Sequence, residues 1–106
     1  MTSIIEIRHL VTASGNDAPN QLVHQIGDYH VLISYGVIIA INARYTTFIN
    51  RDYWDYSQTT LRYLKQFLGT SRTKAQLAKV FENLREFELY SNDFMNDMYR
   101  TLYRGV

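Results

Sequence analysis

The sequence predicts an α+β domain in which an antiparallel sheet comes first and three helices follow. Short β-rich segments separated by turn residues fill the first half of the chain, and apolar residues at helical spacing fill the second half. Strands followed by helices favour α+β over a parallel α/β sheet. The chain has 106 residues, close to the commonest domain size, so we expect residues 1–106 to form a single domain.

We expect an antiparallel sheet of four or five strands within residues 4–49. Ile4 to Val11 is rich in β-forming residues and predicts the first strand, and Leu22 to Ile26 predicts a shorter second strand. The intervening segment 12–20 contains the only proline of the chain, Pro19, together with a cluster of turn-forming residues. This segment is therefore predicted to be a loop.

A tight hairpin is predicted near the middle of the chain. Tyr29–Ser34 and Val37–Ile41 both favour strands, and Tyr35-Gly36 between them leaves room for a two-residue turn. Gly36 is suited to that turn because glycine adopts the left-handed conformation without steric cost. The other predicted turns are Gly27-Asp28, Asn42–Arg44 and Asn50–Asp52, and the last predicted strand is Tyr45–Ile49.

Three helices are expected, at about residues 58–68, 74–88 and 92–104. Each begins with a capping residue: Ser57 or Thr59, then Thr73 in a capping box with Gln76, then Ser91 or Asn92. Gly69 and Gly105 are suitable ends for the first and third helices. The predicted buried stripes are Leu61, Leu64, Phe67 and Leu68; Leu77, Val80, Phe81, Leu84 and Phe87; and Phe94, Met95, Met98, Tyr99 and Leu102.

Three apolar helix stripes are more than one face of a small sheet can cover. We therefore expect part of this surface, including Phe94, Met98 and Leu102, to be buried in a two-fold homodimer. The nine tyrosines also favour a binding surface, because tyrosine combines an apolar ring with a polar tip.

The charge is unevenly distributed although the net charge is only +1. Residues 51–79 contain six basic and two acidic side chains, whereas residues 80–97 contain five acidic side chains and Arg85. This pattern indicates either two solvated helix faces or a dipolar surface that steers a charged partner. A net charge this small counts against simple DNA binding, which usually requires a basic domain.

The composition favours a cytoplasmic protein that does not interact with membranes. There is no cysteine, which excludes disulfides and thiolate metal sites. The longest apolar run, Val37–Ile41, is far shorter than the roughly 20 residues of a membrane span. Residues 1–6 lack the pattern of a secretory signal.

We expect neither catalysis nor a cofactor. The three histidines, His9, His24 and His30, show no metal-ligand spacing, and the Gly27-Asp28 turn interrupts the register that would place two of them on one sheet face. No serine lies in a nucleophile elbow, and no glycine-rich loop is present to hold a phosphate.

The segment from Tyr56 to Tyr63 is the most distinctive part of the sequence. Three hydroxyls, those of Ser57, Thr59 and Thr60, crowd a predicted helix start, where unpaired backbone N–H groups attract phosphate. The simpler interpretation is an ordinary N-cap. Tyr63 is suited to stack on a base. The candidate residues for binding a partner or nucleic acid are Arg62, Tyr63, Lys65, Arg72, Lys74 and Lys79.

Several of these residues also carry a family resemblance. Ser34-Tyr35-Gly36, Ile39-Ala40, Tyr56-Ser57, Thr59-Thr60 and Phe67-Leu68 form a "Ser-Tyr-x-x-x-hydrophobic-Ala" hairpin followed by "Tyr-Ser-x-Thr-Thr" and a helix. In this respect residues 29–68 resemble a group of small uncharacterised phage proteins. The resemblance implies a viral origin and a place in the host cell cytoplasm.

By analogy with small phage accessory proteins, the resemblance also implies binding to a host protein or nucleoprotein complex without catalysis. Inhibition of a host defence of the CRISPR type, as by an anti-CRISPR protein, is one form of this hypothesis. The alternative is a nucleic-acid-binding protein that uses the basic segment 57–79. A third and least favoured hypothesis is an enzyme built on the helix start at Ser57–Tyr63.

Overall fold

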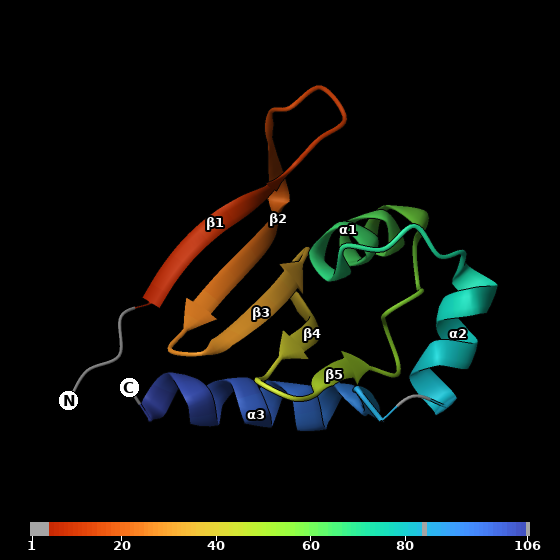
Figure 1. The fold of residues 1–106 in the computed structure, drawn as a ribbon. Helices are drawn as coiled ribbons and strands as arrows, with labels where there is room; N and C mark the ends of the chain where they lie inside the picture. Colours follow the sequence, from red (N-terminus) through yellow and green to blue (C-terminus); the bar gives the residue numbers. More distant parts are fainter. Residues whose placement is uncertain (1–4, 84, 106) are drawn as a thin grey trace.

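The computed structural model describes residues 5–83 and 85–105 and shows an α+β fold with a six-stranded sheet (Figure 1). The strands lie in the sheet in chain order. They are β1 (Ile5–Val11), β2 (Asp17–Ile26), β3 (Tyr29–Ser34), β4 (Val37–Asn42), β5 (Thr47–Asn50) and β6 (Phe87–Tyr90). The helices are α1 (Gln58–Leu68), α2 (Lys74–Asn83) and α3 (Asn92–Arg104).

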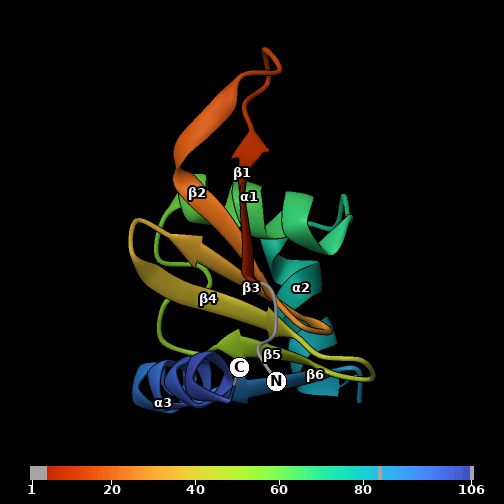
Figure 2. The same cartoon turned by 90° about the vertical axis from the view of Figure 1, so that its left-hand side faces the viewer.

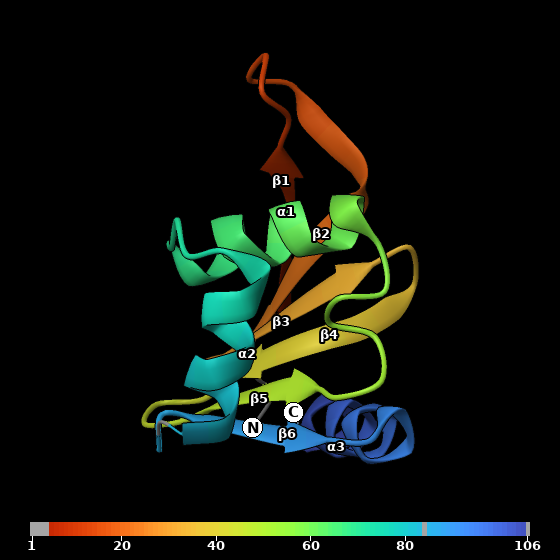
Figure 3. The same ribbon diagram turned by 90° about the vertical axis from the view of Figure 1, so that its right-hand side faces the viewer.

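Helices cover both faces of the sheet. Figures 2 and 3 show α1 and α2 on one face and α3 on the other. Strands β1 to β5 form an antiparallel meander, whereas β6 pairs with β5 in parallel after the chain has passed through α1 and α2. The α+β class is confirmed, but the sheet is larger than predicted and is mixed rather than purely antiparallel.

The predicted tight hairpin is present between β3 and β4. Tyr35 has φ 50° and Gly36 has φ 79°, so both turn residues lie in the left-handed region. A two-residue turn with this backbone twists in the same sense as the strands that it joins. Ser34 and Val37 therefore pair directly on either side of the turn.

The predicted starts of all three helices and the predicted ends of α1 and α3 are also confirmed. Ser57 is the N-cap of α1, Gly69 ends this helix with φ 69°, and Ser91 caps α3. Serine fills both caps, rather than Thr59 or Asn92, because each serine hydroxyl accepts the backbone N–H three residues later. Thr73 and Gln76 form the predicted capping box, with reciprocal bonds of 2.9 and 3.2 Å.

The predicted loop at residues 12–20 is too long. β2 begins at Asp17, which pairs with Val11, and the remaining turn is closed by a bond from Thr12 N to Asn16 O. Pro19 is exposed in this extension, where the β1–β2 register is irregular. Proline is tolerated at such a position because it breaks no regular ladder bond.

The second predicted helix is wrong at its end. α2 stops at Asn83, and Phe87, expected on its apolar stripe, is the first residue of β6. Strand pairing explains the change, because Thr47 N bonds to Glu86 O at 2.7 Å and Arg51 N bonds to Tyr90 O at 2.7 Å. These bonds satisfy backbone N–H groups along the edge of β5 that would otherwise lack partners. Leu84, another residue of the predicted stripe, lies outside the described residues.

The core has two parts, one on each face of the sheet. The larger part lies beneath α1 and α2, where Leu64 and Leu77 are fully buried and Trp54 packs edge-on against Phe81. The smaller part lies beneath α3, which contributes the fully buried Met95. None of the helices described here has the length and apolar character needed to cross a membrane.

The predicted buried face of α3 is only partly buried. Phe94 remains 40% exposed, although it belongs to the apolar stripe. Its ring stacks on Tyr90 with a centroid separation of 4.0 Å, so it lies at the border of the α3 core rather than inside it.

Candidate functional site

The hydroxyls at the start of α1 are largely used within the fold. Ser57 Oγ accepts a bond of 3.0 Å from Thr60 N, which is the capping contact. Thr60 is fully buried, and its Oγ1 lies 2.9 Å from Ser34 Oγ on β3. Thr59 is half-buried. The structure therefore favours the capping interpretation of this segment over an anion site.

Tyr63 is not available for base stacking in the folded protein. Its side chain is 6% exposed and belongs to the core beneath α1. Tyrosine at this helix position fills the space between α1 and the sheet, one turn after the buried Thr60.

The predicted basic residues remain on the surface. Arg62, Arg72, Lys74 and Lys79 are exposed, and Lys65 is half-buried. Lys74 Nζ lies 3.7 Å from Asp55 Oδ2, an exposed ion pair of small energy. Together these side chains extend from α1 through the connecting segment to α2.

A row of polar side chains crosses the sheet on the face that carries α1 and α2. Gln25 pairs with His30, His30 with Asn42, and Asn42 with Thr47. Thr47 pairs in turn with Phe87 on β6. Because directly paired residues point to the same face, this row runs beside the apolar core.

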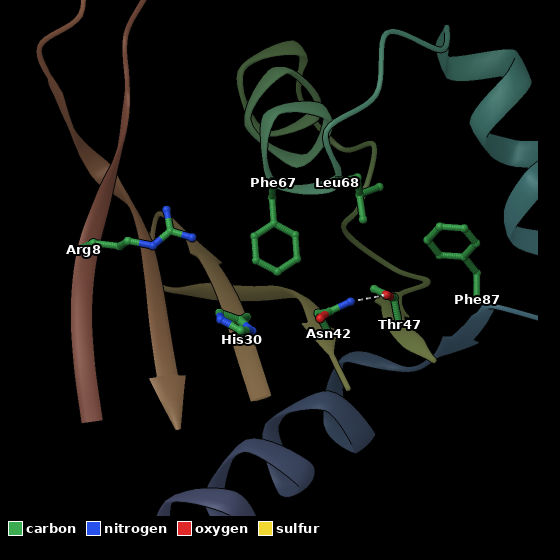
Figure 4. A pocket seen from close by; sticks show the side chains of 7 residues that line it. All are labelled: Arg8, His30, Asn42, Thr47, Phe67, Leu68 and Phe87. Carbon is green, nitrogen blue, oxygen red and sulfur yellow. Dashed lines mark hydrogen bonds between the residues drawn. The ribbon is translucent and has the colours of Figure 1, made fainter. Parts of the chain in front are cut away.

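The polar row forms the floor of a cavity of about 340 Å³, here called the polar pocket (Figure 4). Its floor consists of His30, Asn42 and Thr47, and Arg8 of β1 reaches in from one end. Asn42 Nδ2 donates a bond of 2.8 Å to Thr47 Oγ1. The apolar lining is Phe67 and Leu68 from the last turn of α1, and Phe87 from β6.

A second cavity, of about 460 Å³, lies beside α3 on the opposite face of the sheet. This α3 groove is lined mainly by apolar side chains and includes one carboxylate. Its main residues are Tyr29, Phe48, Phe94, Asp97, Met98 and Leu102. Tyr29 and Phe94 are 37% and 40% exposed, so the groove presents aromatic surface to solvent.

His24 lies on the α3 face, opposite to His30. Its Nδ1 is 2.9 Å from the hydroxyl of Tyr99 on α3. Burial lowers the pKa of His24, and burial, followed by the charge of Tyr103, raises the pKa of Tyr99. Both shifts favour neutral forms, so this pair is a neutral hydrogen bond that fastens α3 to β2.

The described residues contain no group of three His, Cys, Asp or Glu side chains placed to hold a metal ion. Sequence reasoning missed the polar pocket and named only half of the groove, Phe94, Met98 and Leu102. The sequence shows the alternation of side chains along β3 and β4. It does not show the strand register or the pairing of Phe87 with β5, and the pocket depends on both.

The comparisons with known proteins place the chain in a family without a known role. No curated protein and no solved structure matches it. Residues 5–83, which include the whole of β1 to α2, match the model described as "Family of unknown function (DUF8033)". The chain belongs to this family.

Proposed function

We propose that this protein acts without catalysis, by binding another protein through the α3 groove. The observation that carries the proposal is the exposed aromatic surface in this groove, where Phe94 is 40% exposed beside Met98 and Leu102. Apolar grooves of this kind mark protein interaction sites, and aromatic side chains dominate the binding energy of interfaces.

Phe94 is held in place before a partner binds. Its ring stacks on Tyr90, and Tyr90 contacts Phe48, with ring centroids 4.0 and 5.5 Å apart. An anchor that is already ordered loses little conformational entropy on binding. This supports a role as a docking surface.

The partner we propose is a host protein or nucleoprotein complex. Support comes from the resemblance of residues 29–68 to a group of small uncharacterised phage proteins, and from the analogy with phage accessory proteins, which often act by binding host macromolecules. Inhibition of a CRISPR-type defence complex is the most specific form of this proposal.

The test uses a substitution that damages the groove without damaging the helix. Phe94→Glu places a charge in the groove, yet position 94 lies three residues after the cap Ser91, where glutamate completes a capping box. We expect a tagged parent protein to retain a specific partner from host cells, and Phe94→Glu to lose it.

A matched control keeps the groove and changes the basic surface. The double variant Arg62→Glu, Lys65→Glu should retain the partner. If the control loses the partner and Phe94→Glu keeps it, the basic surface is the binding site. Salt-sensitive binding of free oligonucleotides that is abolished by the same control would instead indicate nucleic-acid binding.

A second copy of the chain is the other occupant that fits the groove, as the predicted homodimer requires. Sedimentation equilibrium at micromolar concentration distinguishes a second copy of the chain from a different partner protein. If the parent protein is a dimer and Phe94→Glu is a monomer, the groove is the site of self-association. If the parent protein is a monomer of 12.5 kDa, the groove is free to bind a different protein.

A further inference from the structure

We propose that the polar pocket binds a small aromatic carboxylate. The carboxylate would lie at the Arg8 and His30 end, and the ring would lie beneath Phe67 and against Phe87. This site is on the opposite face of the sheet from the α3 groove, so the inference is independent of the proposed protein partner.

The charge of the lining selects an anion. Arg8 is the charged side chain among the lining residues, and none of them is acidic. Its guanidinium extends over the pocket floor towards Phe67 (Figure 4). A guanidinium presents a planar pair of donors that matches a carboxylate, which makes arginine the usual partner for this group.

The neutral polar groups supply further donors beside the cation. Asn42 Nδ2 uses one of its two N–H groups on Thr47 Oγ1, so its second N–H and the hydroxyl hydrogen of Thr47 remain to be donated. His30 can donate from its imidazole ring, whose position between Arg8 and Asn42 makes the donor set continuous (Figure 4).

The apolar side of the pocket selects a flat ring. Phe67 and Leu68 project from α1 towards the sheet, and Phe87 closes the far end beside Thr47 (Figure 4). The cavity of about 340 Å³ is at the small end of the range for ligand sites. A single ring with one acidic group satisfies both the size and the division of the pocket into a cationic and an aromatic end.

The strand positions of these residues also favour a ligand site over a structural role. Leu32, Ala40 and Ile49, which occupy the neighbouring row on the same face, are fully buried core residues. His30 and Asn42 lie two residues away from Leu32 and Ala40 on the same strands and remain half-exposed. A few polar groups gathered beside an apolar wall are typical of small-molecule sites.

The test is an NMR titration of the ¹⁵N-labelled protein with phenylacetate, phenylacetamide and acetate. Phenylacetate should shift the amide signals of Arg8, His30 and Asn42, with a Kd on the order of 1 mM. Phenylacetamide has the ring without the charge and should bind at least about tenfold more weakly. Acetate has the charge without the ring and should also bind more weakly.

Two variants locate the site. Arg8→Gln should weaken phenylacetate binding about tenfold, because it removes a charge-assisted hydrogen bond. Arg100→Gln is the matched control, since Arg100 is an exposed arginine of α3 on the other face, and it should bind like the parent.

Equal affinities for phenylacetate and phenylacetamide, or equal affinities of the parent and Arg8→Gln, would overturn the proposal. Signals that move around Phe94 and Met98 instead of the pocket would overturn it as well. Phe94→Glu should leave phenylacetate binding unchanged, which separates this site from the proposed docking groove.

Discussion

The two faces of the sheet differ in how completely their helices cover them. Beneath α1 and α2 the core includes fully buried Leu64 and Leu77 and the aromatic pair of Trp54 and Phe81. α3 contributes Met95 as its fully buried residue and leaves Phe94 40% exposed. The first face therefore buries the larger part of the core, and the second face leaves apolar surface exposed beside α3.

The two faces are linked at the end of β5. Asn50 is fully buried, and its Nδ2 donates to Ile38 O at 2.9 Å and to Asn92 Oδ1 at 2.8 Å. Its Oδ1 accepts from the backbone N–H groups of Asp52 and Tyr53. This single side chain connects the sheet, the turn after β5 and the start of α3.

The largest expected loss of stability comes from a core substitution on the face that α1 and α2 cover. Leu64→Ala should lower the free energy of unfolding by about 3 kcal/mol, and Met95→Ala by about 2 kcal/mol, because the thinner α3 core relaxes more easily around a cavity. Urea denaturation of both variants measures the difference. Equal losses would show that α3 covers a core as rigid as that beneath α1.

The next largest loss of stability is expected at Asn50, whose hydrogen bonds link the two faces of the sheet. Asn50→Asp keeps the accepting oxygen but replaces the donor that serves Ile38 and Asn92, so it should cost about 2 kcal/mol. Asn20→Asp, at an exposed position of β2, should change stability by less than about 0.5 kcal/mol. If both variants have the same urea midpoint, Asn50 does not hold the two faces together.

A smaller effect concerns the start of α1. Ser57→Ala should cost about 1 kcal/mol because it removes the bond to Thr60 N. Thr59→Ala should leave the denaturation midpoint almost unchanged, since serine rather than Thr59 is the cap. A larger loss from Thr59→Ala than from Ser57→Ala would contradict the observed capping.

The smallest effect is a pH dependence of the α3 face. Burial holds the pKa of His24 below its ordinary value of 6.5, so the unfolded chain binds a proton more readily than the folded protein. The stability linked to His24 is present above pH 6.5 and is lost as the pH falls through the lower folded pKa. Urea midpoints from pH 7.5 down to 5 should fall more for the parent than for His24→Gln, and parallel curves would rule out this linkage.

Much of the fold could be predicted because it depends on neighbouring residues. The turn at Tyr35-Gly36, the caps at Ser57 and Ser91, the stop at Gly69 and the Thr73–Gln76 box each involve groups a few positions apart. Their conformations are set by local sterics and local hydrogen bonds, which the sequence alone displays.

The candidate binding surfaces could not be predicted in the same way, because they depend on distant segments. Tyr63 seemed suited to the surface, but its side chain packs beneath α1 against the sheet. Phe94 fits a buried stripe, yet the position of α3 on β4 and β5 leaves it beside an open groove. An apolar spacing shows which side of a helix is buried, but not how far the sheet beneath it extends.

By itself the sequence determined the α+β class, the helix starts, and the tight hairpin between β3 and β4. Only the tertiary structure decided that Phe87–Tyr90 leaves the helical pattern and pairs with β5, more than 35 residues earlier in the chain. The physical reason is that an open strand edge must satisfy its backbone groups, and a distant segment can do so at the expense of a local helical preference. The same pairing brings Phe87 to the polar pocket, so that site also exists only in the folded protein.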